Sequence, residues 1–267
     1  MALPKQLYKY EAFNSRALEN LKAHGIYFGS PLGFNDPYDC ATRPFVKRLN
    51  EAEVEVIRQH YIAKEDIPPE AKKSFADASV SALQDMLQSS GEKVIDETIE
   101  KFLAKRGISC FSERNDDLLM WAHYGGSYKG FCLEFSTQYL PLSGAKQVKY
   151  HERIPETSVL PFLVDGQIDL AVDFFCIKPS SWSYEREWRV IHKQAGTLYH
   201  YEAQALTGVY FGPEISEEAL EIICLILRGQ NPYVKFWRGK RSATEFKVEF
   251  SEINYLTHLE AKERGLL

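Results

Sequence analysis

The sequence lacks paired cysteines and long apolar runs. Its five cysteines are odd in number and show neither CxxC nor Cys/His spacing. They therefore predict buried free thiols in a reducing compartment, not disulfides or structural zinc. No apolar run approaches the roughly 18 residues that a membrane-spanning helix needs, and no secretory leader pattern precedes the first expected strand. We therefore expect a cytoplasmic protein with no membrane partner.

The sequence also lacks an excess of positive charge. Its formal net charge is −5 and its pI is about 5.9, so charge gives no indication of a nucleic-acid partner. It contains no GxSxG elbow, HExxH helix, EF-hand loop, GxGxxG or GxxxxGK motif. No motif therefore predicts a serine hydrolase, a zinc protease, a calcium-binding loop or a phosphate-binding loop.

What the sequence contains is an ordinary globular composition, with 45% hydrophobic and 13% aromatic residues over 267 positions. Short strands are expected at Leu7–Tyr10, Ile26–Gly29, Ile108–Ser112, Phe131–Phe135, Gln147–Tyr150, Trp188–Ile191, Val209–Phe211, Val234–Trp237 and Phe246–Phe250. Residues 50–106 have a helical pattern, broken at Pro68-Pro69 and again at Ser89-Ser90-Gly91. We expect one α+β domain over 1–267, with a mixed, mostly antiparallel strand core and a helical insertion at about 50–106.

Four segments carry more aromatic, charged and glycine residues than folding requires. The first is Tyr8–Tyr10, which includes Lys9, together with the turn-rich stretch Ser30–Cys40. Asn35, Asp36 and Pro37 are typical of a turn, and turn formation explains Asn35 and Asp36 without any function. It explains Ser30 and Asp39 less well.

The second segment is Asp116–Lys129, an expected helix that ends at His123 and Tyr124 before two glycines. A helix C-terminus stabilises a histidinium, and paired glycines let the backbone approach a ligand closely. His123 lies among Trp121, Tyr124 and Lys129 in the sequence. A catalytic role and a simple capping role both remain open for His123.

The third segment is Ser180–Ile191. As a strand of period two, it places Glu185, Glu187 and Arg189 on one face and Trp182 and Tyr184 on the other. Such charges are costly to bury unless they pair or bind something, so a salt-bridge ladder is the alternative to a ligand site. A functional Glu187 predicts that Glu187→Gln removes activity at little cost in stability, whereas a structural one predicts marked destabilisation. The fourth segment, Gly208–Pro213, leads into a capped helix and is a weaker candidate for anion binding.

These segments together resemble a widespread bacterial and phage family known as a domain of unknown function. The matching stretches are Leu7–Tyr10, Ile26–Asp39, Cys110–Glu113, Met120–Phe135 and Trp182–Arg189. A more distant resemblance is to the ADP-ribosyltransferase superfamily, whose three motifs follow one another in the order of Tyr8–Tyr10, Ile26–Ser30 and Glu185-Arg186-Glu187. The chain departs from it with Lys9 in place of Arg or His, and with Gly29-Ser30-Pro31 in place of STS.

The second resemblance implies a nucleotide-processing enzyme, an NAD-dependent transferase or NAD hydrolase. In that hypothesis Glu187 hydrogen-bonds the ribose 2′-hydroxyl, Glu185 activates an acceptor, and Lys9, Lys129 or Arg189 holds the pyrophosphate. The catalytic candidates are Glu187, Glu185 and His123. The ligand-binding candidates are Lys9, Tyr10, Ser30, Asn35, Asp36, Asp39, Trp121, Tyr124, Lys129, Trp182, Tyr184 and Arg189, and we expect their segments to converge on one cleft.

Two alternatives remain open. In the first, a phosphoester hydrolase binds Mg²⁺ through Asp36, Asp39 and Glu187 while His123 moves a proton. In the second, the protein is a non-catalytic module that senses a nucleotide or a protein partner, for example in phage defence. The sequence alone does not decide whether the protein is an enzyme.

Overall fold

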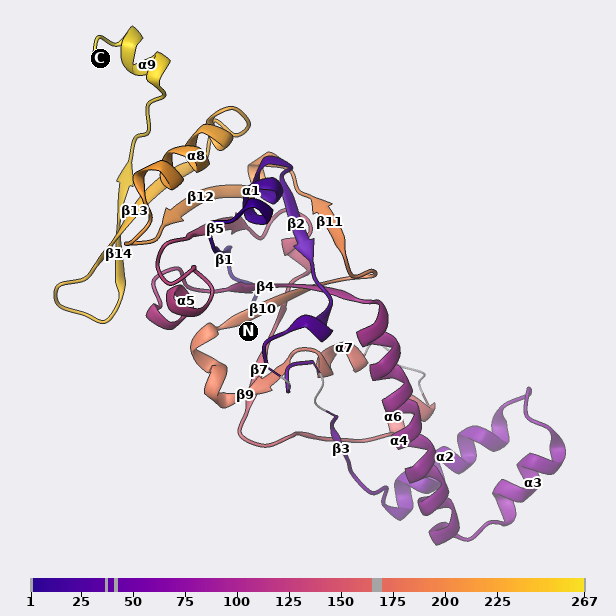
Figure 1. Cartoon of the computed structure of the whole chain (residues 1–267). Coiled ribbons are helices and arrows are strands. Elements are labelled where there is room, and N and C mark those ends of the chain that lie inside the picture. Colours follow the sequence, from indigo (N-terminus) through magenta and orange to yellow (C-terminus); the bar gives the residue numbers. More distant parts are fainter. Residues whose placement is uncertain (1, 37, 41–42, 165–169, 267) are drawn as a thin grey trace. The chain divides into compact units, whose positions relative to one another are not determined.

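The computed structural model describes residues 2–36, 38–40, 43–164 and 170–266 (Figure 1). The chain divides into two compact units. Unit 1 comprises Met1–Ser30, Arg106–Val148 and Ser181–Leu267, and unit 2 comprises Pro31–Lys105 and Lys149–Ser180. The sequence predicts a single domain with an insertion, and that relationship between the two units stays a prediction.

Unit 1 is built on an eight-stranded sheet with the order β14-β13-β12-β5-β1-β4-β10-β6. Its strands are β1 (Gln6–Glu11), β4 (Gly107–Ser112), β5 (Phe131–Ser136), β6 (Lys146–Gln147), β10 (Glu187–His192), β12 (Leu206–Phe211), β13 (Lys235–Arg241) and β14 (Val248–Ile253). Neighbouring strands run antiparallel except β12 and β13. The predicted α+β class with a mixed, mostly antiparallel core is therefore confirmed. A separate antiparallel pair joins β2 (Gly25–Phe28) to β11 (Thr197–His200).

One face of this sheet is apolar because alternate strand residues project to the same side. Leu7, Phe131, Phe135, Val209 and Phe211 all belong to one buried cluster. Helices α1 (Ser15–Lys22) and α8 (Glu217–Arg228) contribute their apolar residues to the same cluster and lie over this face (Figure 1). Side chains at Asn14 and Ser216 cap the two helices.

The opposite face of the sheet is polar and aromatic. The register places Tyr8 opposite Glu134 and Ser112, Ser112 opposite Glu187, and Tyr210 opposite Cys132. Helix α5 (Leu118–His123) packs Met120 and Trp121 into an aromatic cluster on this face. The remaining helical segments of unit 1 are the 3-10 turns η2 (Leu142–Gly144), η3 (Ser180–Glu185), which begins at the last residue of unit 2, and η4 (Ala203–Ala205), and the helix α9 (His258–Glu263).

Unit 2 is mainly helical. It contains η1 (Pro31–Gly33), α2 (Glu51–Ala63), α3 (Pro69–Asp77), α4 (Val80–Lys105), α6 (Leu160–Val164) and α7 (Leu170–Phe174). Two short parallel pairs complete it, β3 (Phe45–Val46) with β8 (Glu156–Thr157) and β7 (Lys149–His151) with β9 (Ile177–Pro179). The capping box predicted from Asn50 and Glu53 is present at the start of α2.

Two element predictions are wrong. Ser89-Ser90-Gly91 does not break a helix, because α4 continues through it and Gly91 is buried where a β-carbon would lie 2.3 Å from Val159 Cγ1. The glycine therefore allows close packing. The single strand expected at Gln147–Tyr150 is divided into β6 and β7, which belong to different units.

Among the described residues, no helix is both long and apolar enough to cross a membrane. The cysteines are free thiols, four of them buried and Cys110 half-buried.

Candidate functional site

The η3 turn determines the geometry of the candidate site in unit 1. The sequence predicts strand alternation throughout Ser180–Ile191, but Ser180–Glu185 is a 3-10 turn and Arg186 has φ 44°. The predicted alternation is therefore wrong before Glu187, where β10 begins. The turn is held because the Ser112 hydroxyl donates to the Glu185 carbonyl at 2.7 Å and Glu113 N–H donates to the Arg186 carbonyl at 3.2 Å.

Glu185 is the carboxylate that this turn positions. Its side chain is buried, with 3% of the residue exposed, and its Oε1 accepts a hydrogen bond of 2.7 Å from the Tyr124 hydroxyl. Tyr124 is the C-cap of α5, so residues 61 positions apart meet at this contact. A bond between a hydroxyl and a carboxylate is short and strong, and it fixes both side chains.

Four rings, here called the aromatic row, lie beside Glu185. Trp182 and Tyr184 have ring centroids 6.0 Å apart, Tyr184 and His123 6.4 Å, and His123 and Tyr124 6.2 Å. His123 is exposed and the other three are half-buried. The row thus presents aromatic surface to solvent next to a buried carboxylate.

Glu187 and Arg189 form a buried ion pair on β10. The Arg189 guanidinium donates from Nε to Glu187 Oε1 at 2.7 Å and from Nη2 to Oε2 at 2.9 Å. Glu187 is 4% exposed and Arg189 is 0% exposed. This geometry is the buried ion pair that the structural alternative for the segment predicts, because the arginine binds the carboxylate bidentately.

Glu134 on β5 is a buried acid that sequence reasoning missed. Its Oε1 accepts from Gln6 at 3.0 Å and Thr207 at 2.6 Å, and its Oε2 accepts from Tyr8 at 3.1 Å and Tyr210 at 2.7 Å. Burial, followed by the nearby Glu134 carboxylate, raises the pKa of the Tyr8 phenol, and burial with the hydrogen bond to Glu134 raises that of Tyr210. A lone acid within the apolar strand Phe131–Phe135 was the available signal.

Among the other predicted site residues of unit 1, Tyr10 and Trp121 belong to the aromatic cluster against which Tyr124 and Tyr184 pack, whereas Lys9 does not. Lys9 lies on the other face of β1 from Tyr10, 3.7 Å from Glu11 and over the Phe111 ring. Tyr10 is buried against Trp121, and its hydroxyl donates to the Arg114 carbonyl at 2.9 Å. Trp121 is fully buried and donates to the Asn115 carbonyl. Lys129 is exposed.

The first predicted turn segment is divided between the units. Ser30 is half-buried at the end of one stretch of unit 1, whereas Asn35, Asp36 and Asp39 belong to unit 2. Asp36 accepts from Tyr38 N–H at 2.8 Å, which is the turn contact expected from the sequence, and Asn35 is exposed. Pro37 lies outside the described residues.

Asp39 is paired inside unit 2. Its Oδ2 lies 3.3 Å from Lys178 Nζ, and both residues are 5% exposed. Within the residues that the structure describes, no group of three or more His, Cys, Asp and Glu side chains is arranged to hold a metal ion. The magnesium set of Asp36, Asp39 and Glu187 stays an untested hypothesis, since it draws on both units.

Comparison with known proteins finds one family model that matches part of the chain, and it indicates no activity. Residues 120–190 match the model of a family described as "Protein of unknown function (DUF2971)". This range contains α5 from Met120 onward, the aromatic row, Glu185, Glu187 and Arg189. No curated protein and no solved structure gives a match.

Proposed function

We propose that unit 1 is an NAD-cleaving enzyme in which Glu185 is the principal catalytic carboxylate and the aromatic row binds the nicotinamide end of the substrate. The observation that carries this proposal is the buried Glu185 carboxylate, held at 2.7 Å by Tyr124 beside four exposed or half-buried rings. The matched family region covers both features.

The aromatic row supplies the binding surface. Planar heteroaromatic rings stack on tyrosine, tryptophan and histidine faces, and a cationic nicotinamide ring is further favoured over an aromatic face. Neighbouring centroids lie about 6 Å apart and the ring planes are tilted by 36°, 37° and 62°, so a nucleotide ring would stack on one of these faces at a time. A nucleotide that stacks there lies against the Glu185 carboxylate.

Glu185 supplies the charge that the reaction needs. When the bond between ribose C1′ and the nicotinamide nitrogen breaks, the electron pair goes to the ring nitrogen and the ribose becomes oxocarbenium-like. A fixed carboxylate nearby stabilises this positive charge. Water then bonds to C1′ and loses a proton, which leaves ADP-ribose and nicotinamide; an acceptor hydroxyl in place of water gives transfer.

Glu187 and Arg189 have a different place in this scheme. Because Arg189 pairs with Glu187, the charge of the Glu187 carboxylate is neutralised. We therefore assign both residues a structural role in the sheet face that supports the site. In this scheme Glu185, and not Glu187, is the carboxylate that acts on the ribose.

The test is nicotinamide release from NAD by the full chain, measured beside NAD binding by calorimetry. Glu185→Gln keeps the shape and the acceptor for Tyr124 but loses the charge. We expect cleavage to fall by about 100-fold or more while NAD affinity changes only a few-fold. Trp182→Ala is expected to weaken binding.

Two matched controls separate the site from general damage. Glu221→Gln also changes a glutamate that accepts a tyrosine hydroxyl, from Tyr255 at 3.2 Å, but on α8. Tyr233→Ala removes a ring that is 80% exposed outside the aromatic row. Both variants should behave as wild type. NAD binding without cleavage would instead favour the sensing module, and absence of both would overturn the proposal.

A further inference from the structure

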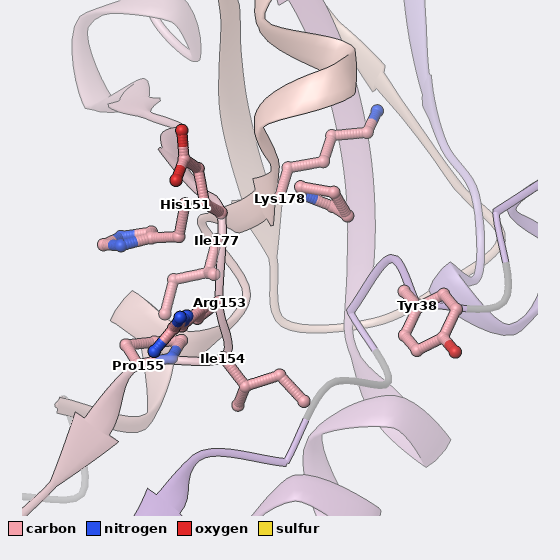
Figure 2. Close-up of a pocket in the computed structure, with 9 residues that line it drawn as sticks. Tyr38, His151, Arg153, Ile154, Pro155, Ile177 and Lys178 are labelled. Atoms are coloured by element: carbon pink, nitrogen blue, oxygen red, sulfur yellow. The ribbon is translucent and has the colours of Figure 1, made fainter.

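Unit 2 contains a cavity of about 200 Å³ that the proposed function does not use (Figure 2). It is lined by all three residues of β9, by His151 at the end of β7, and by the chain that leaves β7. The volume is below the roughly 300 Å³ at which pockets for drug-sized ligands begin, so the occupant must be small.

The polar side chains that line this cavity include Arg153, Lys178 and His151, with Glu152 as the acid. Lys178 is engaged with Asp39 at 3.3 Å. Within the described parts of the chain, the side chains of Arg153 and His151 have no hydrogen-bond or ion-pair partner. An exposed, unpaired guanidinium that lines a cavity is able to bind an oxyanion bidentately.

The rest of the lining is apolar. Ile154, Pro155 and Ile177 lie beside Arg153 in the close-up (Figure 2), and Ile154 is 51% exposed. A free inorganic anion would leave this surface in contact with water. A compact apolar group attached to the anion would cover it and add hydrophobic stabilisation.

We propose that this cavity binds a small organic anion, whose phosphate or carboxylate group is held by Arg153 and His151 and whose apolar body rests on Ile154, Pro155 and Ile177. The site lies entirely within unit 2 and its existence does not depend on NAD cleavage by unit 1.

The experiment measures binding to the full chain by calorimetry and ligand-observed NMR. Phenyl phosphate carries both groups, inorganic phosphate only the anion and phenol only the ring. We expect phenyl phosphate to bind at least about tenfold more tightly than either fragment. Benzoate replaces the phosphate by a carboxylate, so its affinity relative to phenyl phosphate identifies the preferred anion.

Arg153→Gln removes an exposed, unpaired guanidinium, so the fold should be preserved. We expect it to weaken phenyl phosphate binding by roughly tenfold or more, as loss of a charge-assisted hydrogen bond does. Arg48→Gln is the control, because it removes an exposed guanidinium of the same unit that pairs with Asp85 outside the cavity. Ile154→Trp, at an exposed lining position, should block the cavity. Failure of phenyl phosphate to bind at millimolar concentration, or an equal loss in Arg48→Gln, would overturn the proposal.

Discussion

At the residue scale, the chemistry of the polar sheet face depends on how each buried acid is balanced. Glu187 is bound by a guanidinium, Glu134 accepts from four neutral donors, and Glu185 accepts from the Tyr124 hydroxyl. Glu134 also lies beside rings in mutual contact, because its donor Tyr8 contacts Tyr210 and Tyr210 contacts Trp237. Glu185 is the catalytic candidate because its donor Tyr124 belongs to the aromatic row, which contains the exposed His123.

Glu187→Gln tests the structural assignment of Glu187. The substitution removes one charge from a fully buried pair and replaces one acceptor oxygen by a donor that faces the Arg189 guanidinium. We expect the free energy of unfolding to fall by about 3–5 kcal/mol. Chemical denaturation measures this, with Glu252→Gln as a control at an exposed pair with Lys235. A loss below about 1 kcal/mol, with NAD cleavage abolished, would return Glu187 to a catalytic role.

At the element scale, strand positions were predictable wherever the pattern of apolar residues in the sequence matches a buried face of the sheet. Phe131–Phe135 and Val209–Phe211 were placed correctly because apolar residues alternate in them or fill them. Helices α1, α2 and α8 begin at side chains that cap them locally, Asn14, Asn50 and Ser216. These signals are local, so the sequence carries them directly.

Elements that depend on distant contacts were not predictable. The η3 turn exists because Ser112 on β4 holds the Glu185 carbonyl, and no local pattern indicates that contact. The same turn decides which of Glu185 and Glu187 lies beside the aromatic row. The composition of the candidate site was therefore visible in the sequence, whereas the pairing of Glu187 with Arg189 and the role of Glu134 required the sheet register.

Gly91→Ala tests why α4 passes through a predicted break. Alanine favours a helix over glycine by about 1 kcal/mol, but its β-carbon would overlap Val159. We expect net destabilisation of about 1–3 kcal/mol from overpacking, seen as a lower denaturation midpoint. Ser90→Ala, at the exposed neighbouring position, should be neutral or slightly stabilising. Adding Val159→Ala to Gly91→Ala should recover part of the loss, and an absence of recovery would mean that the contact does not limit packing.

At the scale of the whole molecule, the burial of several tyrosine hydroxyls makes the stability of the fold depend on pH in the alkaline range. Burial is the leading cause that raises the pKa of Tyr10, Tyr201 and Tyr210. The Tyr210 hydroxyl also donates to Glu134, so its ionisation would place two negative charges together. Tyr233 and Tyr38, by contrast, are 80% and 62% exposed.

These raised pKa values predict how stability changes with pH. An unfolded tyrosine ionises near pH 10, whereas the folded chain keeps these three neutral to higher pH. The contribution of these three tyrosines to the free energy of unfolding is therefore complete below about pH 10. It is lost as the pH rises further, by up to about 1.4 kcal/mol per pH unit for each phenol, because the unfolded state releases protons first.

The measurement is a titration of tyrosinate absorbance beside near-ultraviolet circular dichroism. We expect Tyr10, Tyr201 and Tyr210 to ionise above pH 10, in a phase that coincides with loss of the dichroism signal. Tyr210→Phe should reduce the amplitude of that phase. Ionisation of all 15 tyrosines in one phase near pH 10 with dichroism intact would contradict the burial of these phenols. The result matters for the site, because Tyr210 and Tyr8 both donate to Glu134, on the sheet face that supports it.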